Sequence, residues 1–158
     1  MQTVYIETTI ISYLTARPSR DLIRAAHQQI TREWWENDRH RYELFTGQMA
    51  LIEAAAGDPE AAADRLAVLH ELPLLMDSAD VPALAQALIS ATALPAVAGR
   101  DAVHVATAAT TGMDYLLTRN CRHLANASLR DKISAVCRAE GFRAPIICTP
   151  EELREVVE

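Results

Sequence analysis

The sequence predicts an α/β fold, a three-layer sandwich with a central parallel sheet of four to five strands. Three observations support this fold class. Short runs of apolar, β-branched residues alternate with longer stretches whose apolar residues recur every three or four positions. The first run, residues 4–11, is apolar on both faces, which is typical of a strand that helices cover on both sides. Helical stretches separate successive strands, and this order favours crossover connections between parallel strands.

The first helix is expected over residues 20–37. Ser19 is its candidate N-cap, because a hydroxyl oxygen there can accept a hydrogen bond from the first helical turn. Trp35 is expected near the surface, where large aromatic side chains often mark a protein interface. The apolar stripe has the spacing of a helix that packs on a sheet and consists of Ile23, Ala26, Ile30 and Trp34.

The later elements continue the alternation. Asp58 directly before Pro59 marks one helix start, and Thr149 with Glu152 forms the capping signature of a terminal helix. Further helices are predicted over residues 48–56, 59–72, 81–93, 101–111 and 129–139. Further strands are predicted over residues 42–46, 74–76, 115–118 and 144–148.

Composition places the chain among globular domains. Its 158 residues suit one domain over residues 1–158, and the hydrophobic share of 50% excludes extended disorder. No run reaches the roughly 18 apolar residues that a membrane helix requires, and no export signal precedes the first strand. The three cysteines are too few for a disulfide framework and form no CxxC pair, so a cytoplasmic location is expected.

Charge and missing motifs exclude several function classes. The net charge of −6 argues against binding nucleic acid through a broad basic surface, although it leaves room for a small local site. The phosphate-binding loop of P-loop nucleotidases needs a lysine between a glycine and a hydroxyl residue, whereas the sole lysine, Lys132, stands in a helix-like stretch. The patterns GxGxxG, GxSxG and HExxH are absent as well.

Two glutamates stand where apolar residues are expected. Glu7 interrupts the first strand near the carboxyl edge of the sheet, where ligands bind in open parallel sheets. Burying an ionised carboxylate among isoleucines is costly, so Glu7 needs a cation or several donors unless it caps the strand or reaches solvent. Glu53 shares a helix face with Met49 and Ile52, and it therefore points inward unless it flanks a narrow apolar stripe.

Three further polar residues lie near predicted helix and strand ends. Asp101 opens a helix, where an acid commonly complements the helix dipole, and His104 lies one turn further on the same side. We interpret His104 as a satisfied structural histidine, with hydrogen bonding to Asp101 as the alternative. Asn120 follows a strand, either as a turn residue or as part of a ligand site. Cys121 and His123 are not expected to bind zinc, since no second pair lies within zinc spacing.

These residues lie in segments that resemble one known family. The segments YIETTIISYL, MALIEAAAGDPEAAADRL, GRDAVHVATAATTGMDYLLTRN and HLAN are similar, in this order and over nearly the whole chain, to the PIN-domain family and notably to its VapC-type toxin branch. The stretch from DAVHVA to DYLLTRN is the most specific part. The resemblance implies a PIN-like fold and a ribonuclease that depends on Mg²⁺ or Mn²⁺, as the toxin of a type II toxin–antitoxin pair.

The resemblance also implies the roles of individual residues. Mapped onto this chain, the catalytic residues are Glu7, Glu53, Asp101 and Asn120. Glu7 and Asp101 would bind the metal, Glu53 would bind it or orient a water, and Asn120 would make an outer contact. The family usually has aspartate at the first position and often a fourth acid at the last. Glu7 and the uncharged Asn120 depart from this pattern, and both favour weaker metal binding and a single firmly held ion.

The implied partners are an RNA substrate, a cognate antitoxin and a second copy of the chain in a homodimer, with no membrane among them. Five arginines are placed at the carboxyl rim of the predicted sheet, where they would hold phosphates of a single strand. Each of them, taken alone, fits solvated loop charge equally well. They are Arg17, Arg20, Arg100, Arg119 and Arg122.

Two other functions remain compatible with the residues. The longer Glu7 and the neutral Asn120 would suit a PIN-like fold that has lost catalysis and binds RNA or protein. A phosphoacceptor signalling domain also gathers acids at strand ends, but its chemistry needs a lysine in the site. Lys132 is expected in a distant helix, so the hypothesis of a phosphoacceptor domain ranks last.

Overall fold

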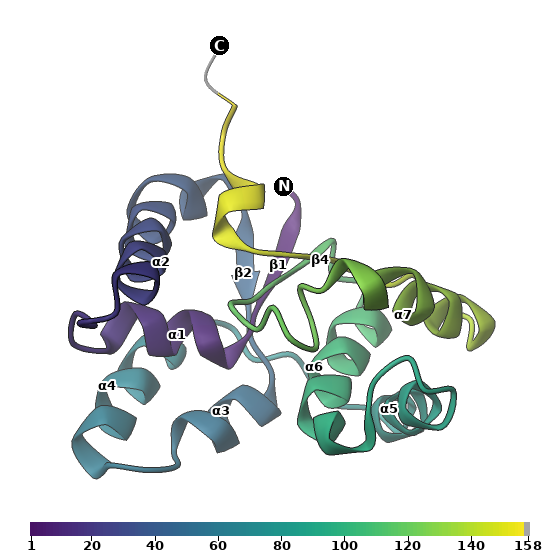
Figure 1. Ribbon diagram of the computed structural model, residues 1–158. Coiled ribbons are helices and arrows are strands. Elements are labelled where there is room, and N and C mark those ends of the chain that lie inside the picture. Colours follow the sequence, from purple (N-terminus) through teal and green to yellow (C-terminus); the bar gives the residue numbers. More distant parts are fainter. Residues whose placement is uncertain (157–158) are drawn as a thin grey trace.

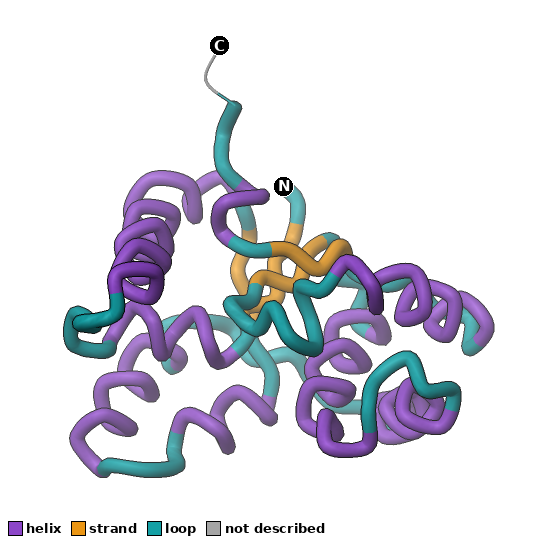
Figure 2. The backbone as a smooth tube through the Cα atoms, viewed as in Figure 1, coloured by secondary structure: helices purple, strands orange, loops and turns teal. Residues whose placement is uncertain are grey.

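Four short parallel strands form the centre of the protein, whose computed structural model describes residues 1–156 (Figures 1 and 2). In order across the sheet they are β2 (Glu43–Phe45), β1 (Thr3–Ile6), β3 (Tyr115–Leu117) and β4 (Ile146–Cys148). The register pairs Tyr5 with Phe45 on one side and with Leu116 on the other. All four strands therefore end at one edge of the sheet, and the predicted α/β fold with a parallel sheet is confirmed.

Helices cover both faces of the sheet, as Figure 2 shows. On one face lie α1 (Thr8–Thr15), α2 (Leu22–Glu33), α3 (Gln48–Ala54) and α4 (Pro59–Leu69), and on the other α5 (Asp80–Ser90), α6 (Gly99–Thr110) and α7 (Ala127–Ala139). Strand β1 contributes to both layers, because Val4 and Ile6 pack in the first and Tyr5 in the second. Within residues 1–156, no helix is long and apolar enough to cross a membrane.

Strand β1 is shorter than its apolar sequence predicts. The expected strand over residues 4–11 ends at Ile6, and α1 begins at Thr8. Glu7 acts as the N-cap of α1, because its carboxylate accepts a hydrogen bond from the backbone N–H of Thr9 at 3.0 Å. The isoleucines that read as strand are instead buried on α1, where packing against the sheet outweighs their strand propensity.

The first long helix also differs from its prediction. Asp21, not Ser19, caps α2, and Ile23 on the predicted stripe is 71% exposed. The helical path continues beyond α2 as a π-helical turn, η1 (Trp34–Asp38), and a 3₁₀ turn, η2 (Arg39–Arg41). Trp34 is fully buried as expected, and Trp35 is half-buried.

Two other predicted elements are reduced. The predicted strand over residues 74–76 is a single bridge between Thr46 and Leu74, so the sheet has four full strands. The predicted terminal helix is the 3₁₀ turn η4 (Pro150–Leu153), and its capping box forms as predicted. A further 3₁₀ turn, η3 (Ala96–Ala98), leads into α6.

Candidate metal centre

The carboxyl ends of β1 and β3 bring two sequence motifs together. Glu7 follows β1 and Thr118 follows β3, and the backbone N–H of Glu7 donates to the carbonyl of Leu117 at 3.1 Å. Hydroxyl groups then join the two strand ends. Thr9 Oγ1 accepts from the backbone N–H of Arg119 at 2.8 Å. The segments ETT and LLTRN, far apart in the sequence, therefore form one continuous edge.

Glu7 lies buried at this edge, with 2% of its surface exposed. Its Oε2 accepts hydrogen bonds from the Thr118 hydroxyl at 2.8 Å and from both the hydroxyl and the backbone N–H of Thr9. Its Oε1 accepts no hydrogen bond from the described residues and lies 3.9 Å from His104 Nε2. Burial raises the pKa of Glu7, although His104 and the three donors act in the opposite direction.

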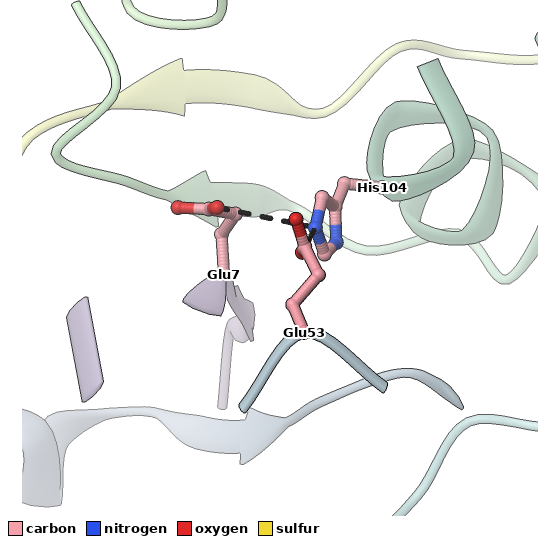
Figure 3. Close-up of side chains that lie close together, drawn as sticks. All are labelled: Glu7, Glu53 and His104. Carbon is pink, nitrogen blue, oxygen red and sulfur yellow. Dashed lines mark hydrogen bonds and ion pairs between the residues drawn. The ribbon is translucent and has the colours of Figure 1, made fainter. Parts of the chain in front are cut away.

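Glu53 reaches the same place from helix α3. Its Oε1 accepts a hydrogen bond from His104 Nε2 (Figure 3) and another from the Thr8 hydroxyl at 2.7 Å. Its Oε2 has no donor in the described part of the chain. Burial acts to raise the pKa of Glu53, but the hydrogen bond and charge of His104, with Thr8 and Arg100, outweigh it and lower that pKa. Glu53 thus points inward as predicted, although Ile52 beside it is 50% exposed.

His104 is the fully buried partner of both glutamates. Its Nδ1 forms a hydrogen bond of 2.6 Å with the hydroxyl of Tyr5. Burial acts to lower the pKa of His104, but the hydrogen bond to Glu53 and the charges of Glu7, Glu53 and Asp101 raise it. The site is therefore a network in which one imidazole lies between two carboxylates.

The donor set fits a divalent cation. One potential ligand atom from each of Glu7, Glu53 and His104 lies within 4.8 Å of the other two. Each glutamate also keeps one carboxylate oxygen without a hydrogen-bond donor among residues 1–156. Hard cations such as Mg²⁺ and Mn²⁺ prefer carboxylate oxygens, and a nearby cation offsets the cost of burying the charge of Glu7.

Asp101 and Asn120 meet each other beside this cluster. Asn120 Nδ2 donates to Asp101 Oδ1 at 3.2 Å, and His123 Nδ1 lies 3.0 Å from Asp101 Oδ2. Asp101 stands one turn before His104 on α6, and its charge contributes to the raised pKa of His104. Asp101 is thus adjacent to the cluster, but both its oxygens are engaged and it does not belong to the group that gathers within 4.8 Å.

The five predicted phosphate-binding arginines divide into two groups. Arg119 is 7% exposed, and its guanidinium donates to the Thr31 hydroxyl, the His27 carbonyl and the Glu151 carboxylate. The expectation of a phosphate contact by Arg119 is therefore corrected, because its donors are occupied within the fold. The other four are exposed: Arg17, Arg20, Arg100 and Arg122.

Two histidines contact the predicted acids. His104 has both ring nitrogens hydrogen-bonded, to Tyr5 and to Glu53, which agrees with its interpretation as a satisfied histidine. His123, which is not expected to bind zinc, contacts Asp101. The sequence offered no signal for this contact, because it depends on how the loop after β3 returns toward α6.

Comparisons with known proteins agree with the fold. The sequence matches no family model, and no curated protein shows significant sequence similarity to it. Among solved structures, the chain is similar to a chain in the crystal structure of VapBC2 from Rickettsia felis bound to a DNA fragment from their promoter. The TM-score is 0.53 at 12% identity, over 94% of this chain and 98% of the other. At this identity the likeness shows the fold, which is the PIN-like α/β fold that the sequence predicts.

Proposed function

We propose that the protein is a metal-dependent ribonuclease and the toxin of a type II toxin–antitoxin pair. The observation that carries the proposal is the meeting of Glu7 and Glu53 at the carboxyl edge of the sheet, each with an oxygen free of donors within the described chain. The likeness in fold to a VapBC2 chain supports the VapC-type assignment that the sequence motifs suggested.

The proposed roles follow from the contacts. Glu7 is a direct ligand through Oε1, while Thr9 and Thr118 hold Oε2 in place. Glu53 is a ligand or orients the attacking water through Oε2. The chemistry that Mg²⁺ or Mn²⁺ supplies when bound is Lewis acidity toward water and phosphate oxygens.

Asp101 is proposed as the remaining ligand. It joins the centre by exchanging its contact with His123 for the ion. Asn120 then acts through Asp101, as an outer contact that donates a hydrogen bond without adding charge. Three carboxylates around one position favour a single ion.

Two exposed arginines are proposed to bind the RNA phosphates nearest the acids. Arg100 stands in the first turn of α6 and contributes to the lowered pKa of Glu53, so its charge lies close to the cluster. Arg122 follows Asn120 in the loop that contacts Asp101. Arg17 and Arg20 follow α1 in the chain, whose far end lies about 12 Å along the helix axis from Glu7, and they would contact more distant phosphates.

The proposed partners are a cognate antitoxin and a second copy of the chain, in the cytoplasm. The solved relative is a VapBC2 assembly bound to promoter DNA, and the analogous antitoxin would cover the acidic centre of this chain. The whole described chain is proposed to act as a single PIN-like domain.

The test is cleavage of single-stranded RNA in Mn²⁺ or Mg²⁺. We expect metal-dependent cleavage that a chelator stops and that Asp101→Asn lowers by about 100-fold or more, since losing a proposed ligand should cost at least as much as losing a residue that supports one. Arg138→Met, an exposed change on α7, serves as the control. RNA that is bound but never cut would favour the second candidate, a binding module, which the engaged oxygens of Asp101 and the neutral Asn120 favour.

A further inference from the structure

Three side chains from three elements form a continuous chain of hydrogen bonds under the acidic centre. Tyr5 on β1 contacts His104 Nδ1 at 2.6 Å, and His104 Nε2 on α6 contacts Glu53 Oε1 on α3. Tyr5 and His104 are both fully buried. No other hydrogen bond of the Tyr5 hydroxyl occurs among residues 1–156.

The donors and acceptors in this chain fix the hydrogen on His104 Nε2. The Glu53 carboxylate can only accept, so the hydrogen between the two residues belongs to Nε2. In the neutral imidazole, Nδ1 then accepts from the Tyr5 hydroxyl, which satisfies a buried donor. In the protonated imidazole both nitrogens carry hydrogens. In either form Nε2 has no lone pair to offer a metal, although it lies within 4.8 Å of the glutamate oxygens.

The backbone at Gly47 leaves room for the Tyr5 hydroxyl. A Cβ atom at Gly47 would lie 2.9 Å from Tyr5 Oη and 3.2 Å from a methyl group of Thr107. Gly47 is also the N-cap of α3, the helix that carries Glu53. The absence of a side chain at this position therefore allows Tyr5 to reach His104 while α3 begins alongside.

We propose that His104 and Tyr5 are positioning residues of the metal centre and that His104 is not a ligand. His104 fixes Glu53 by donating from Nε2 to Oε1, which leaves Oε2 for the ion. Tyr5 fixes the ring and the tautomer of His104 through Nδ1. The metal ligands are then carboxylate oxygens alone. The inference rests on the proposed function in one respect, namely that Glu53 serves a metal ion.

The experiment is a calorimetric titration of Mn²⁺ into the full chain and four variants. His104→Leu removes the donor and should weaken Mn²⁺ binding by about 10- to 100-fold, the usual effect of losing a residue that orients a ligand. His104→Gln keeps an N–H donor and should restore most of that affinity. Tyr5→Phe keeps the ring in the core and should weaken binding by about tenfold. Tyr115→Phe, which removes a hydroxyl whose one hydrogen bond within residues 1–156 is to Gln2, is the matched control and should change nothing.

A spectroscopic measurement separates positioning from ligation. Pulsed EPR of bound Mn²⁺ should give the same ¹⁴N coupling in the wild type and in His104→Gln, because no His104 nitrogen is bound to the ion. A directly bonded nitrogen that disappears in His104→Gln would overturn the proposal. Equal Mn²⁺ affinity in the wild type and His104→Leu, whatever the loss of thermal stability, would overturn it as well, and so would a wild type that binds no Mn²⁺.

The two proposals fail separately. Mn²⁺ binding that responds to the variants as expected, in a protein that cuts no RNA, leaves the positioning roles intact and removes the ribonuclease. RNA cleavage that depends on Mn²⁺ but is unchanged in His104→Leu would leave the ribonuclease proposal intact and would remove the positioning role of His104.

Discussion

Two charged clusters lie next to the carboxyl end of β3, one around Arg119 and one around Glu7 and Glu53, and their charged groups differ in how completely they are hydrogen-bonded. In the first, Arg119 uses Nε, Nη1 and Nη2 on Thr31, Glu151 and His27. In the second, Glu7 and Glu53 each keep one carboxylate oxygen without a donor in the described chain, and burial raises the pKa of Glu7. A buried charged group whose hydrogen-bonding atoms all have partners stabilises the fold. A buried carboxylate that keeps an oxygen without a donor can bind a cation there.

The largest expected effect is on the cluster around Arg119. Arg119→Met should lower the free energy of unfolding by about 3 kcal/mol, because it removes the three hydrogen bonds that a buried guanidinium makes to the Thr31 hydroxyl, the His27 carbonyl and the Glu151 carboxylate. Chemical denaturation measures the change. Arg122→Met, an exposed neighbour, should shift stability by less than about 0.5 kcal/mol. Equal effects of the two changes would mean that Arg119 is not a structural residue.

The second effect concerns Asn120 and Asp101, which lie beside the two glutamates. Asn120→Asp should lower the stability of the metal-free protein by about 2 kcal/mol, because a carboxylate would face Asp101 at the place of a hydrogen bond. Mn²⁺ should restore that loss, since a cation relieves the repulsion. Thermal unfolding with and without Mn²⁺ measures both parts. A variant that Mn²⁺ stabilises no more than the wild type would place residue 120 outside the metal centre.

The third effect has the opposite sign. Glu7→Gln should raise stability by about 1 kcal/mol at neutral pH, because it removes a charge that burial disfavours while an amide oxygen can still accept from Thr9 and Thr118. The same change should weaken Mn²⁺ binding. Thermal unfolding and a metal titration on one preparation check the pair of results. A destabilised Glu7→Gln protein would mean that Glu7 serves the fold, as Arg119 does.

The smallest effect depends on pH. Burial acts to raise the pKa of Glu151, but the hydrogen bond and charge of Arg119 outweigh it and lower that pKa. Its stabilising contribution is therefore present above its ordinary pKa and is lost as pH falls through the lowered value. Glu151→Gln should cost about 0.5 kcal/mol at pH 7, a small figure because the side chain is 39% exposed, and nothing near pH 2. A difference that is the same at both values would show that charge plays no part.

The parallel sheet and the two glutamates could be predicted from the sequence. The sheet follows from the alternation of apolar strands with helices, and each glutamate interrupts an apolar pattern. Glu7 stands out within an apolar run, and Glu53 within a helix face. The end of β1 could not be read in the same way, because α1 continues the apolar run and only the capping contact of Glu7 separates strand from helix.

The roles of the arginines and histidines depend on packing between distant segments. Arg119 and Arg122 look alike in the sequence, but the first turns toward α2 and the second toward solvent. His104 reaches Glu53 through the packing of α3 against α6, and a single helix pattern cannot predict that contact. Periodicity reports which face of an element is buried, and it does not report which partner lies there.

The most direct test of the account is a calorimetric titration of Mn²⁺ into the wild type and into the double variant Glu7→Gln, Glu53→Gln. The account predicts a single saturable site in the wild type and none in the double variant, which should remain folded. Equal binding by both proteins, or no binding by the wild type at millimolar Mn²⁺, would contradict the claim that these two carboxylates form a metal centre.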